Sequence, residues 1–312
     1  MVWDLILTEV FFIGLFAGAI RLATPLMIAA LGEIYAERSG VLNLGLEGIM
    51  EAGAIIGFLA TFITGSPWLG IFAAMVFGIF LGFIKAVMSV SLGTNQVING
   101  LLITTLGTGI GLFVYRGYFG ATAPTIPIFE AINFPVLSDI PFIGPIFFSH
   151  NILVYLGLIL AAVLGIILYR TTIGLKIKAV GENPKAADTL GINIFRVRYL
   201  CVMISGAMAG IAGAFITVGY LGIYGENLIA GRGFIAVVIA IFSRWSPYRC
   251  IGASLIFGVA DSLTVRLRAI GIGIPYHLLL IVPYVLVVVL ITITFRRAKP
   301  PAAITKPYKR GE

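Results

Sequence analysis

Carboxylates and carboxamides interrupt several strongly apolar stretches of this 312-residue chain. Glu47 and Glu51 stand four residues apart, which places them one turn apart on the same face of a helix, and Asn43 lies just upstream. A polar or charged group in an apolar environment is costly unless it has a partner or reaches water. We therefore expect these three residues either to line a pathway for a polar solute or to hold the entry of a helix.

Asparagines also stand where two other apolar stretches begin. Asn95 and Gln96 are suited to cap a helix start, and Asn99, one turn further on, can bond a neighbouring helix or a polar substrate. Asn227 precedes the stretch 229–243 and has the same two interpretations. The candidate residues for a solute pathway are Asn43, Glu47, Asn99 and Asn227.

Three more charged residues lie in or near apolar stretches. We expect Lys85 to extend its ammonium group towards an aqueous surface, and Asp261 and Arg266 to form an ion pair.

Residues for covalent or metal chemistry are sparse. His150 and His277 are the only histidines, Cys201 and Cys250 are the only cysteines, and no HExxH, CxxC, GxSxG or GxxxxGK[ST] motif occurs. Catalysis of those kinds needs clustered ligands, or a nucleophile beside a base. We therefore expect no catalytic residue, no metal site and no cofactor, with both cysteines as core residues. Any ATP that drives this protein has to be bound by another chain.

The composition excludes several classes of protein. Charged residues make up 11% of the chain, against about 25% in ordinary soluble domains. Hydrophobic residues make up 60%, and the mean hydropathy is +1.08. A soluble enzyme, a nucleic-acid-binding domain and a disordered chain are excluded, because none of them carries so much apolar surface.

The apolar stretches predict an all-α polytopic membrane protein, a single domain over residues 1–312 with about 8–10 transmembrane helices of about 20 residues each. The short, glycine-interrupted stretches are candidates for re-entrant or broken helices: 46–64, 229–243 and 250–264. Small residues recur at four-residue spacing, as in Gly78/Gly82 and Gly206/Gly210, which indicates tight packing within the chain. The predicted spans lie near 8–31, 46–64, 68–91, 96–115, 150–169, 199–219, 229–243, 250–264 and 275–295.

The basic residues predict an orientation. With nine spans, 16 of the 21 Lys and Arg residues fall on one side, which is therefore the cytoplasmic side. This places the loop 170–198 and the basic tail 296–312 in the cytoplasm, with the C-terminus. The segment 116–149 lies outside, and its five prolines favour a stiff, irregular cap.

The loop 170–198 contains a short helix candidate from Asn183 to Leu190. Asn183 can cap it, Pro184 occupies the first helical position, and Gly191 is suited to end it. An amphipathic helix here is built to dock on a partner, and a solvated loop with a chance helix is the alternative. Its apolar stripe comprises Ala186, Ala187 and Leu190.

The string GENPKAADTLGI (181–192) resembles the coupling loop of ABC-importer permeases of the branched-chain amino-acid, ribose and simple-sugar type. That pattern is Gly-x-Asn-x-x-Ala-Ala-x-x-x-Gly-Ile. The strings at 32–54, 95–101 and 274–286 resemble, within this type, the permeases that work with basic-membrane-protein-type lipoproteins and are linked to nucleoside uptake. The matching coupling-loop residues are Gly181, Asn183, Ala186, Ala187, Gly191 and Ile192.

The resemblance covers nearly the whole chain and implies a transmembrane subunit of a bacterial ABC importer, with a type II importer fold in the plasma membrane. It implies a pathway for a nucleoside, a separate ATPase that receives the loop 181–192, and no enzymatic activity of this chain. The other implied partners are a second, related permease, an extracytoplasmic lipoprotein that binds the substrate, and the lipid bilayer; no nucleic acid is expected.

Other functions stay open. A simple sugar such as ribose is the second candidate substrate, and branched-chain amino acids are the third. A secondary carrier without an ATPase needs a coupling carboxylate deep in the bundle, for which Glu47, Glu51 and Asp261 are the candidates. The loop 181–192 argues against that carrier, and the scarcity of histidine and of nucleophile motifs argues against an intramembrane enzyme.

Overall fold

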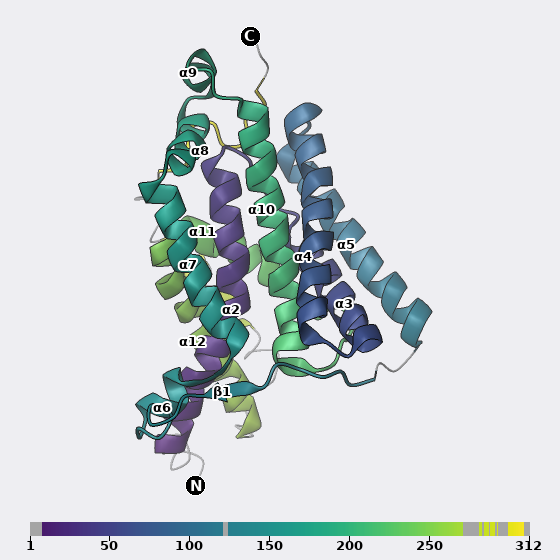
Figure 1. The fold of residues 1–312 in the computed structure, drawn as a ribbon, viewed down its shortest axis with the longest axis vertical. Helices are drawn as coiled ribbons and strands as arrows, with labels where there is room; N and C mark the ends of the chain where they lie inside the picture. The colour runs from purple at the N-terminus through teal and green to yellow at the C-terminus, as the bar shows by residue number, and fades with distance from the viewer. Residues whose placement is uncertain are drawn as a thin grey trace.

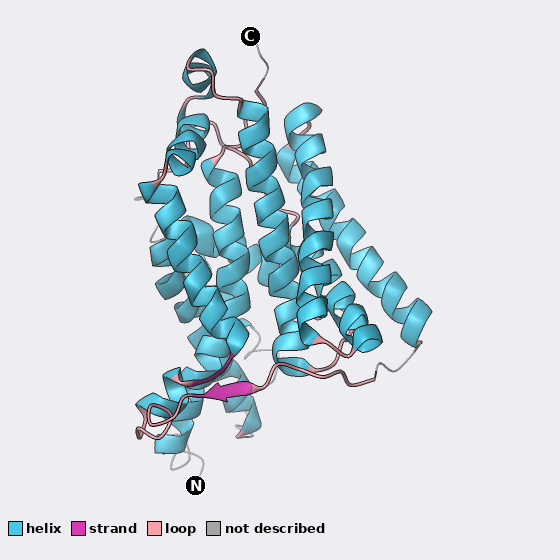
Figure 2. Cartoon of the chain, in the orientation of Figure 1, coloured by secondary structure: helices cyan, strands magenta, loops and turns pink. Residues whose placement is uncertain are grey.

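The computed structural model describes residues 8–120, 124–270, 281–282, 284–286, 288–290, 292 and 299–308. Within these residues the chain is a bundle of long helices that run between two ends (Figure 1, Figure 2). The tail end carries α8 (Thr172–Glu182), α9 (Pro184–Thr189) and residues 299–308. The cap end carries α6 (Ile143–Phe147) and two short strands.

Seven described helices are long and apolar enough to cross a membrane, which confirms the all-α polytopic fold. The predicted span at 275–295 lies largely outside the described residues. The seven helices are α2 (Glu9–Arg38), α3 (Leu46–Thr64), α4 with the π-helix η1 (Pro67–Ser91), α5 (Gln96–Phe119), α7 (Ile152–Arg170), α10 with the π-helix η2 (Ile194–Leu221) and α12 (Pro247–Ala269).

The predicted span 229–243 is corrected by the structure. It is α11 (Arg232–Phe242), a helix of 11 residues. At about 1.5 Å per residue such a helix covers only about half of a hydrocarbon core of about 30 Å. The other two re-entrant candidates, 46–64 and 250–264, lie in the continuous helices α3 and α12.

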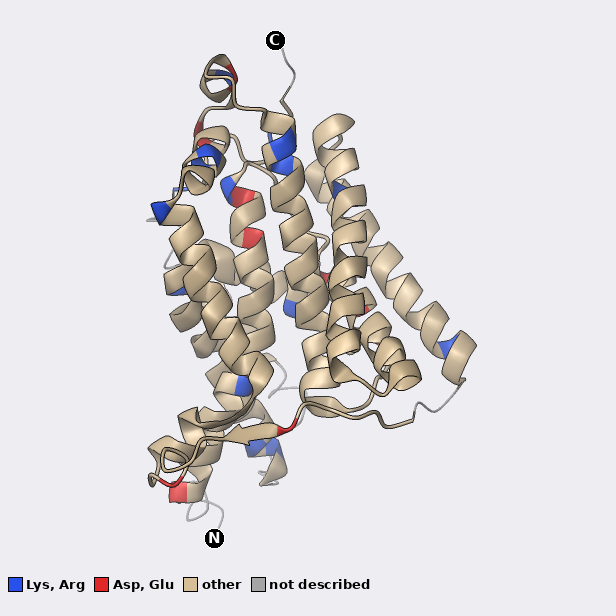
Figure 3. Cartoon of the chain, in the orientation of Figure 1, with Lys and Arg blue, Asp and Glu red and all other residues tan. Residues whose placement is uncertain are grey.

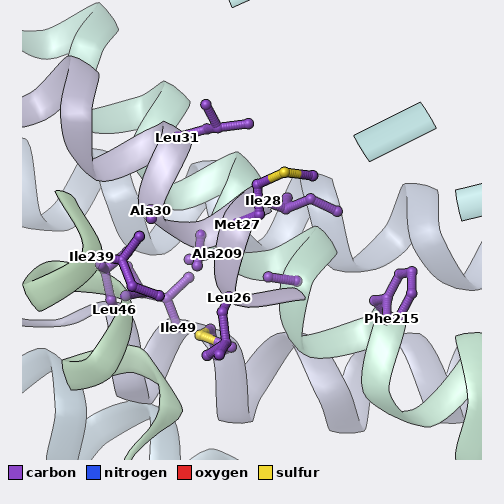
Figure 4. Close-up of a cluster of buried hydrophobic side chains, with 14 of the residues drawn as sticks. Leu26, Met27, Ile28, Ala30, Leu31, Leu46, Ile49, Ala209, Phe215 and Ile239 are labelled. Carbon is purple, nitrogen blue, oxygen red and sulfur yellow. The ribbon is translucent and has the colours of Figure 1, made fainter. Parts of the chain in front are cut away.

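Helix α2 forms the centre of the bundle, because every one of its residues from Ala23 to Glu37 is buried. A helix buried on all sides lies in the core, away from lipid and water. Figure 4 shows Leu26 and Met27 of α2 in a cluster with Ile49 of α3 and Ile239 of α11. The free thiols of Cys201 and Cys250 are buried, as expected of core residues.

Glycine allows the helices to approach one another at backbone distance. A Cβ on Gly78 of α4 would lie 2.2 Å from the carbonyl oxygen of Gly206 in α10. A Cβ on Gly107 of α5 would lie 2.0 Å from the carbonyl oxygen of Gly48 in α3. These contacts lie within one chain, so the predicted role of the small residues in internal packing is confirmed.

The segment 116–149 at the cap end is irregular over most of its described length, as its prolines predict. Three features differ from that prediction: α5 continues to Phe119, the short helix α6 lies within the segment, and β1 (Ala131–Asn133) pairs antiparallel with β2 (Ser149–Asn151). His150 of β2 is buried, and its Nε2 lies 2.7 Å from the carbonyl oxygen of Ile146. Burial lowers the pKa of His150 and thus favours its neutral form.

Two glycines on α5 provide a matched test of the backbone contacts. Gly107→Ala places a methyl group against the backbone of Gly48, whereas a Cβ on Gly109 would have no atom within 4 Å. We expect Gly107→Ala to destabilise the purified permease by about 1–3 kcal/mol, because overpacking moves backbone. Gly109→Ala should be neutral or stabilising by up to about 1 kcal/mol, because alanine favours helix. Melting temperatures in detergent test this, and equal values for the two variants would contradict it.

Candidate functional site

Glu47, in the first turn of α3, caps the start of α11. Its Oε1 accepts a hydrogen bond from the amide of Gly231, and its Oε2 accepts one from the amide of Gly233, both at 2.6 Å. The first amides of a helix have no partner within the helix and carry positive partial charge, so a carboxylate stabilises them. In this structure the carboxylate of Glu47 thus holds the entry of α11.

The sequence Gly231-Arg232-Gly233 makes this junction possible. Gly231 adopts a φ of +85°, a conformation that glycine tolerates without strain. A Cβ on Gly233 would lie 2.4 Å from the backbone of Glu47, so only glycine allows α11 to begin directly against α3. Sequence reasoning did not identify these glycines, although a Gly-x-Gly pair at the start of an apolar helix was the available signal.

Glu51 holds the loop 222–231 that leads into α11. Its Oε1 accepts the hydroxyl of Tyr224 at 2.6 Å, and its Oε2 accepts the amide of Ile229 at 3.1 Å. Asn227 in this loop is exposed and has a φ of +56°, which asparagine tolerates better than most residues. The two carboxylates of α3 therefore hold both the loop 222–231 and the start of the short helix α11.

An ion pair joins α11 to α12. Arg232 Nε lies 3.8 Å from Asp261 Oδ2, so the expected pairing of Asp261 with Arg266 is wrong. The reason is helical geometry: positions five residues apart point about 140° away from one another. The guanidinium of Arg266 instead lies over the ring of Phe11, 6.0 Å from its centroid.

A cavity of about 620 Å³ opens beside Arg232, in the cap-end half of the bundle. It lies between α2, η2, α11 and α12, and most of its wall is apolar. Such a cavity offers aromatic and apolar surface together with a few guanidinium donors. Its polar and aromatic lining comprises Phe11, Arg21, Tyr220, Arg232, Ser262 and Arg266.

Asn43 belongs to a buried polar cluster in the tail-end half. The backbone N–H of Asn43 donates to Glu33 Oε1 at 2.8 Å, and its side-chain Nδ2 donates to Ser205 Oγ at 3.1 Å. Ser205 Oγ in turn donates to Glu33 Oε2 at 3.1 Å. This closed triangle ties α2, α10 and the turn before α3 together, so Asn43 is engaged by protein.

Asn99 belongs to a second polar cluster at the same end. Its Nδ2 donates to Ser89 Oγ at 3.1 Å and to Thr94 Oγ1 at 3.0 Å, and its Oδ1 accepts from Lys85 Nζ. Lys85 is fully buried, so the expectation that it reaches an aqueous surface is wrong. The side chain folds inward because its ammonium group also donates to the carbonyl oxygen of Gln96 at 2.6 Å. Other charged residues are buried as well, namely Glu33, Glu37, Glu47, Glu51 and Arg198, and Figure 3 shows red and blue segments within the bundle as well as at its ends.

The predicted helix in the loop 170–198 is present as α9. Asn183 Oδ1 accepts the amide of Ala186 at 3.1 Å, Pro184 occupies the first turn, and Gly191 has a φ of +77°. The 11-residue helix α8, which precedes α9, was not predicted. Its buried positions, Ile177, Val180 and Gly181 among them, recur at helical spacing, which was the signal that could have found it.

The six residues that match the coupling-loop pattern have different surroundings. A Cβ on Gly181 would lie 2.0 Å from the carbonyl oxygen of Arg38, so Gly181 allows α8 to pack on the end of α2. Ala187 is buried with Val180 and Ile194. Ala186 and Leu190, four residues apart, are exposed, and Leu190 is 78% exposed. The expected stripe is therefore divided, with Ala187 on the inner face and the other two residues on the outer face.

A multi-pass bundle with a broken helix, a cavity beside the break and an exposed capped helix at one end has the features of a transport permease. A family model described as branched-chain amino acid transport system, permease component, matches residues 15–293. The chain belongs to this family of ABC transporter permeases. It is thus the membrane subunit and not the ATP-hydrolysing one, and it works with an ATPase and a substrate-binding protein.

Several ABC transporter permeases are similar to this chain over most of its length. A guanosine ABC transporter permease of Bacillus subtilis is 38% identical over 93% of this chain and 94% of its own. A nucleoside ABC transporter permease of Lactococcus lactis is 34% identical over 90% and 92%, respectively. A Haloferax volcanii protein described as a glucose ABC transporter permease is 39% identical over 83% and 79%. The Bacillus species also has a second guanosine permease that matches at 23%. No solved structure matches the chain.

The cap on α11 gives a testable consequence. Glu47→Gln puts an amide donor against a backbone N–H donor, so one of the two hydrogen bonds is lost in a buried place. We expect that variant to lose most uptake and to melt at a lower temperature, because an unsatisfied buried group costs about 1–3 kcal/mol. Uptake assays and melting curves measure both effects.

Glu226→Gln is the matched control, because Glu226 is exposed in the same loop and bonds only the exposed side chain of Arg116 among the described contacts. Wild-type behaviour is expected there. Similar losses in the two variants would contradict the role of Glu47.

Proposed function

We propose that this chain is the translocation subunit for a nucleoside in an ABC importer, driven by a separate ATPase. The observation that carries the proposal is the cavity beside the start of α11, with its apolar walls, aromatic rings and guanidinium donors. Relatives named for guanosine and nucleosides align with this chain over about nine-tenths of both lengths, which supports the same substrate class.

The chemistry of the cavity favours a nucleoside over a sugar. A nucleobase has two apolar faces and an edge of carbonyl and ring-nitrogen acceptors, which suit an aromatic wall and arginine donors. A hexose presents hydroxyl groups around its ring, and burying them against an apolar wall without partners is costly. An import pathway also requires weak binding, because the solute has to leave again.

A simple sugar is the second candidate. The relative described as a glucose permease supports this alternative. It is 39% identical to this chain, which is close to the 38% and 34% of the guanosine and nucleoside permeases. Both classes are delivered by a binding protein, so uptake by the whole system distinguishes them.

We propose separate roles for the candidate pathway residues. Glu47 holds the wall of the pathway by capping α11, and the exposed Asn227 stands where a substrate arrives at the cap end. Asn43 and Asn99 form part of a gate at the tail end of the bundle. This gate is closed in the present structure, because the side chains of both residues bond other protein groups. They meet a substrate only when those bonds open.

We propose that the tail end faces the cytoplasm and the cap end faces the outside. The basic residues around α8 and the start of α10 support this orientation (Figure 3). The extracytoplasmic partner is a lipoprotein that binds the substrate, and the second permease is a related chain. The pair of guanosine permeases in one Bacillus species, at 38% and 23% identity, supports a heterodimer.

The substrate is tested in proteoliposomes that hold the permease pair, the ATPase and the binding protein. We expect ATP-dependent accumulation of a radiolabelled nucleoside, unaffected by a hundred-fold excess of glucose or ribose. Accumulation of a sugar that an excess of nucleosides does not inhibit would overturn the nucleoside assignment. Equal uptake without ATP would favour a secondary carrier.

The coupling site is tested with the exposed face of α9. Leu190→Asp places a charge at the centre of the proposed ATPase contact, and we expect ATPase binding to weaken at least ten-fold, about 1.4 kcal/mol, with loss of uptake. Val136→Asp is the control, because Val136 is 76% exposed in the segment at the cap end, far from the proposed ATPase contact.

Ala187→Asp is a different case, because Ala187 is buried. That variant should lose folded permease, seen as low abundance in the membrane.

Unchanged ATPase binding in Leu190→Asp would remove α9 from the contact.

A further inference from the structure

The C-terminal segment 301–308 is folded against the tail end of the bundle. The amide of Ala303 donates to the carbonyl oxygen of Gly181 at 2.9 Å, at the end of α8. A Cβ on Gly40 would lie 3.1 Å from the carbonyl oxygen of Ala303, so the segment also touches the turn after α2. Figure 1 shows this yellow segment running between α8 and the start of α10. The segment therefore joins the loop that carries α9 to the central helix.

Arg198 of α10 ties the segment to two core helices. Its guanidinium is buried and donates from Nε to the carbonyl oxygen of Ser39, at the end of α2, at 3.1 Å. It also donates from Nη1 to the carbonyl oxygen of Lys306 at 3.1 Å. A buried charge needs such partners, so displacing the segment would leave this guanidinium short of an acceptor.

Tyr308 joins the same segment to α9. Its hydroxyl donates to Asp188 Oδ2 at 2.9 Å, and its ring meets that of Phe195 edge to face, with 6.2 Å between centroids. Helix α9 has only six residues and connects to its neighbours through Asn183 and Gly191. Ala187 is its only buried residue, so its inner face is small.

A groove lies between the segment and the start of α9. Its volume is about 430 Å³, and its walls come from residues 182–185 on one side and from Ala302, Ala303 and residues 306–308 on the other. The exposed amines of Lys185 and Lys306 stand on its two walls, and the exposed Glu182 lines the same wall as Lys185. A partner that docks on α9 therefore meets the C-terminal segment as well, and the two amines, which outnumber the one carboxylate, favour carboxylates on that partner.

We propose that residues 301–308 are a latch that completes the ATPase-docking surface and carries the movement of α9 to α2 and α10. This rests on the proposed function, because it assigns α9 to the ATPase. The path runs from Asp188 through Tyr308 to the carbonyl oxygen of Lys306, and from there through Arg198 to Ser39. In this account the partner on the groove is an ATPase segment with acidic side chains.

Tyr308→Phe tests the latch with the smallest change, because it removes one hydroxyl and keeps the ring. Asp188→Asn weakens the same hydrogen bond from the other side. Tyr199→Phe is the control, since it also removes one tyrosine hydroxyl, whose hydrogen bond in this structure runs to Ser91 and not to α9. The readout is the number of substrate molecules imported per ATP hydrolysed in proteoliposomes, with the permease melting temperature measured alongside.

We expect Tyr308→Phe and Asp188→Asn each to lower that ratio at least three-fold at a wild-type melting temperature. The double variant should be no worse than either single variant. An unchanged ratio in both single variants, or a drop accompanied by an equal loss in Tyr199→Phe, would overturn the latch. A lower melting temperature with an unchanged ratio would assign the segment to stability alone and would also overturn it.

The outcome is separable from the proposed function. The ratio is measured with whichever substrate the wild-type system imports, so a sugar in place of a nucleoside leaves the test intact. If Leu190→Asp keeps full ATPase binding, the docking assignment of α9 has failed, whatever Tyr308→Phe does.

Discussion

The fold depends on one constraint, which is that backbone amides at membrane depth have no water to bond. A helix that begins inside the bundle exposes its first amides, and α11 begins there. Glu47 of α3 satisfies the amides of Gly231 and Gly233, and Glu51 satisfies that of Ile229. Without these carboxylates the start of α11 would leave buried donors unpaired, at a cost of about 1–3 kcal/mol each. The cavity of about 620 Å³ lies beside Arg232, at the start of α11.

The rest of the bundle surrounds this junction with parts of two kinds. The glycine contacts of α4 with α10, and of α3 with α5, hold these helix backbones in direct contact. The polar clusters around Asn43 and Asn99 lie at the tail end of those units and consist of hydrogen bonds that can exchange partners. Rigid helices with exchangeable bonds at one end suit a permease that opens alternately to each side. The loop with α9 and the C-terminal segment lies at the same end of the bundle (Figure 1), and we propose that the ATPase acts there.

Local signals predicted much of this structure. Apolar length predicted the continuous spans, and the Asn183, Pro184 and Gly191 pattern predicted α9, because capping is decided by neighbours in sequence. The partners of Glu47 were beyond reach, since they lie more than 180 residues away in the chain. Lys85 and Asp261 were misassigned for the same reason. Proximity to a span end favoured an exposed lysine, but the start of α5 covers it, and Arg232 approaches Asp261 from another helix.

We propose that a nucleoside passes the junction that Glu47 holds. A cryo-electron microscopy structure of the assembled importer, with its binding protein and a nucleoside trapped during transport, tests it most directly. We expect density for the nucleoside in the cavity between Arg21 and Arg232, with Glu47 still bonded to Gly231 and Gly233. Density for the substrate elsewhere in the bundle, with that cavity filled by side chains in every state, would contradict it.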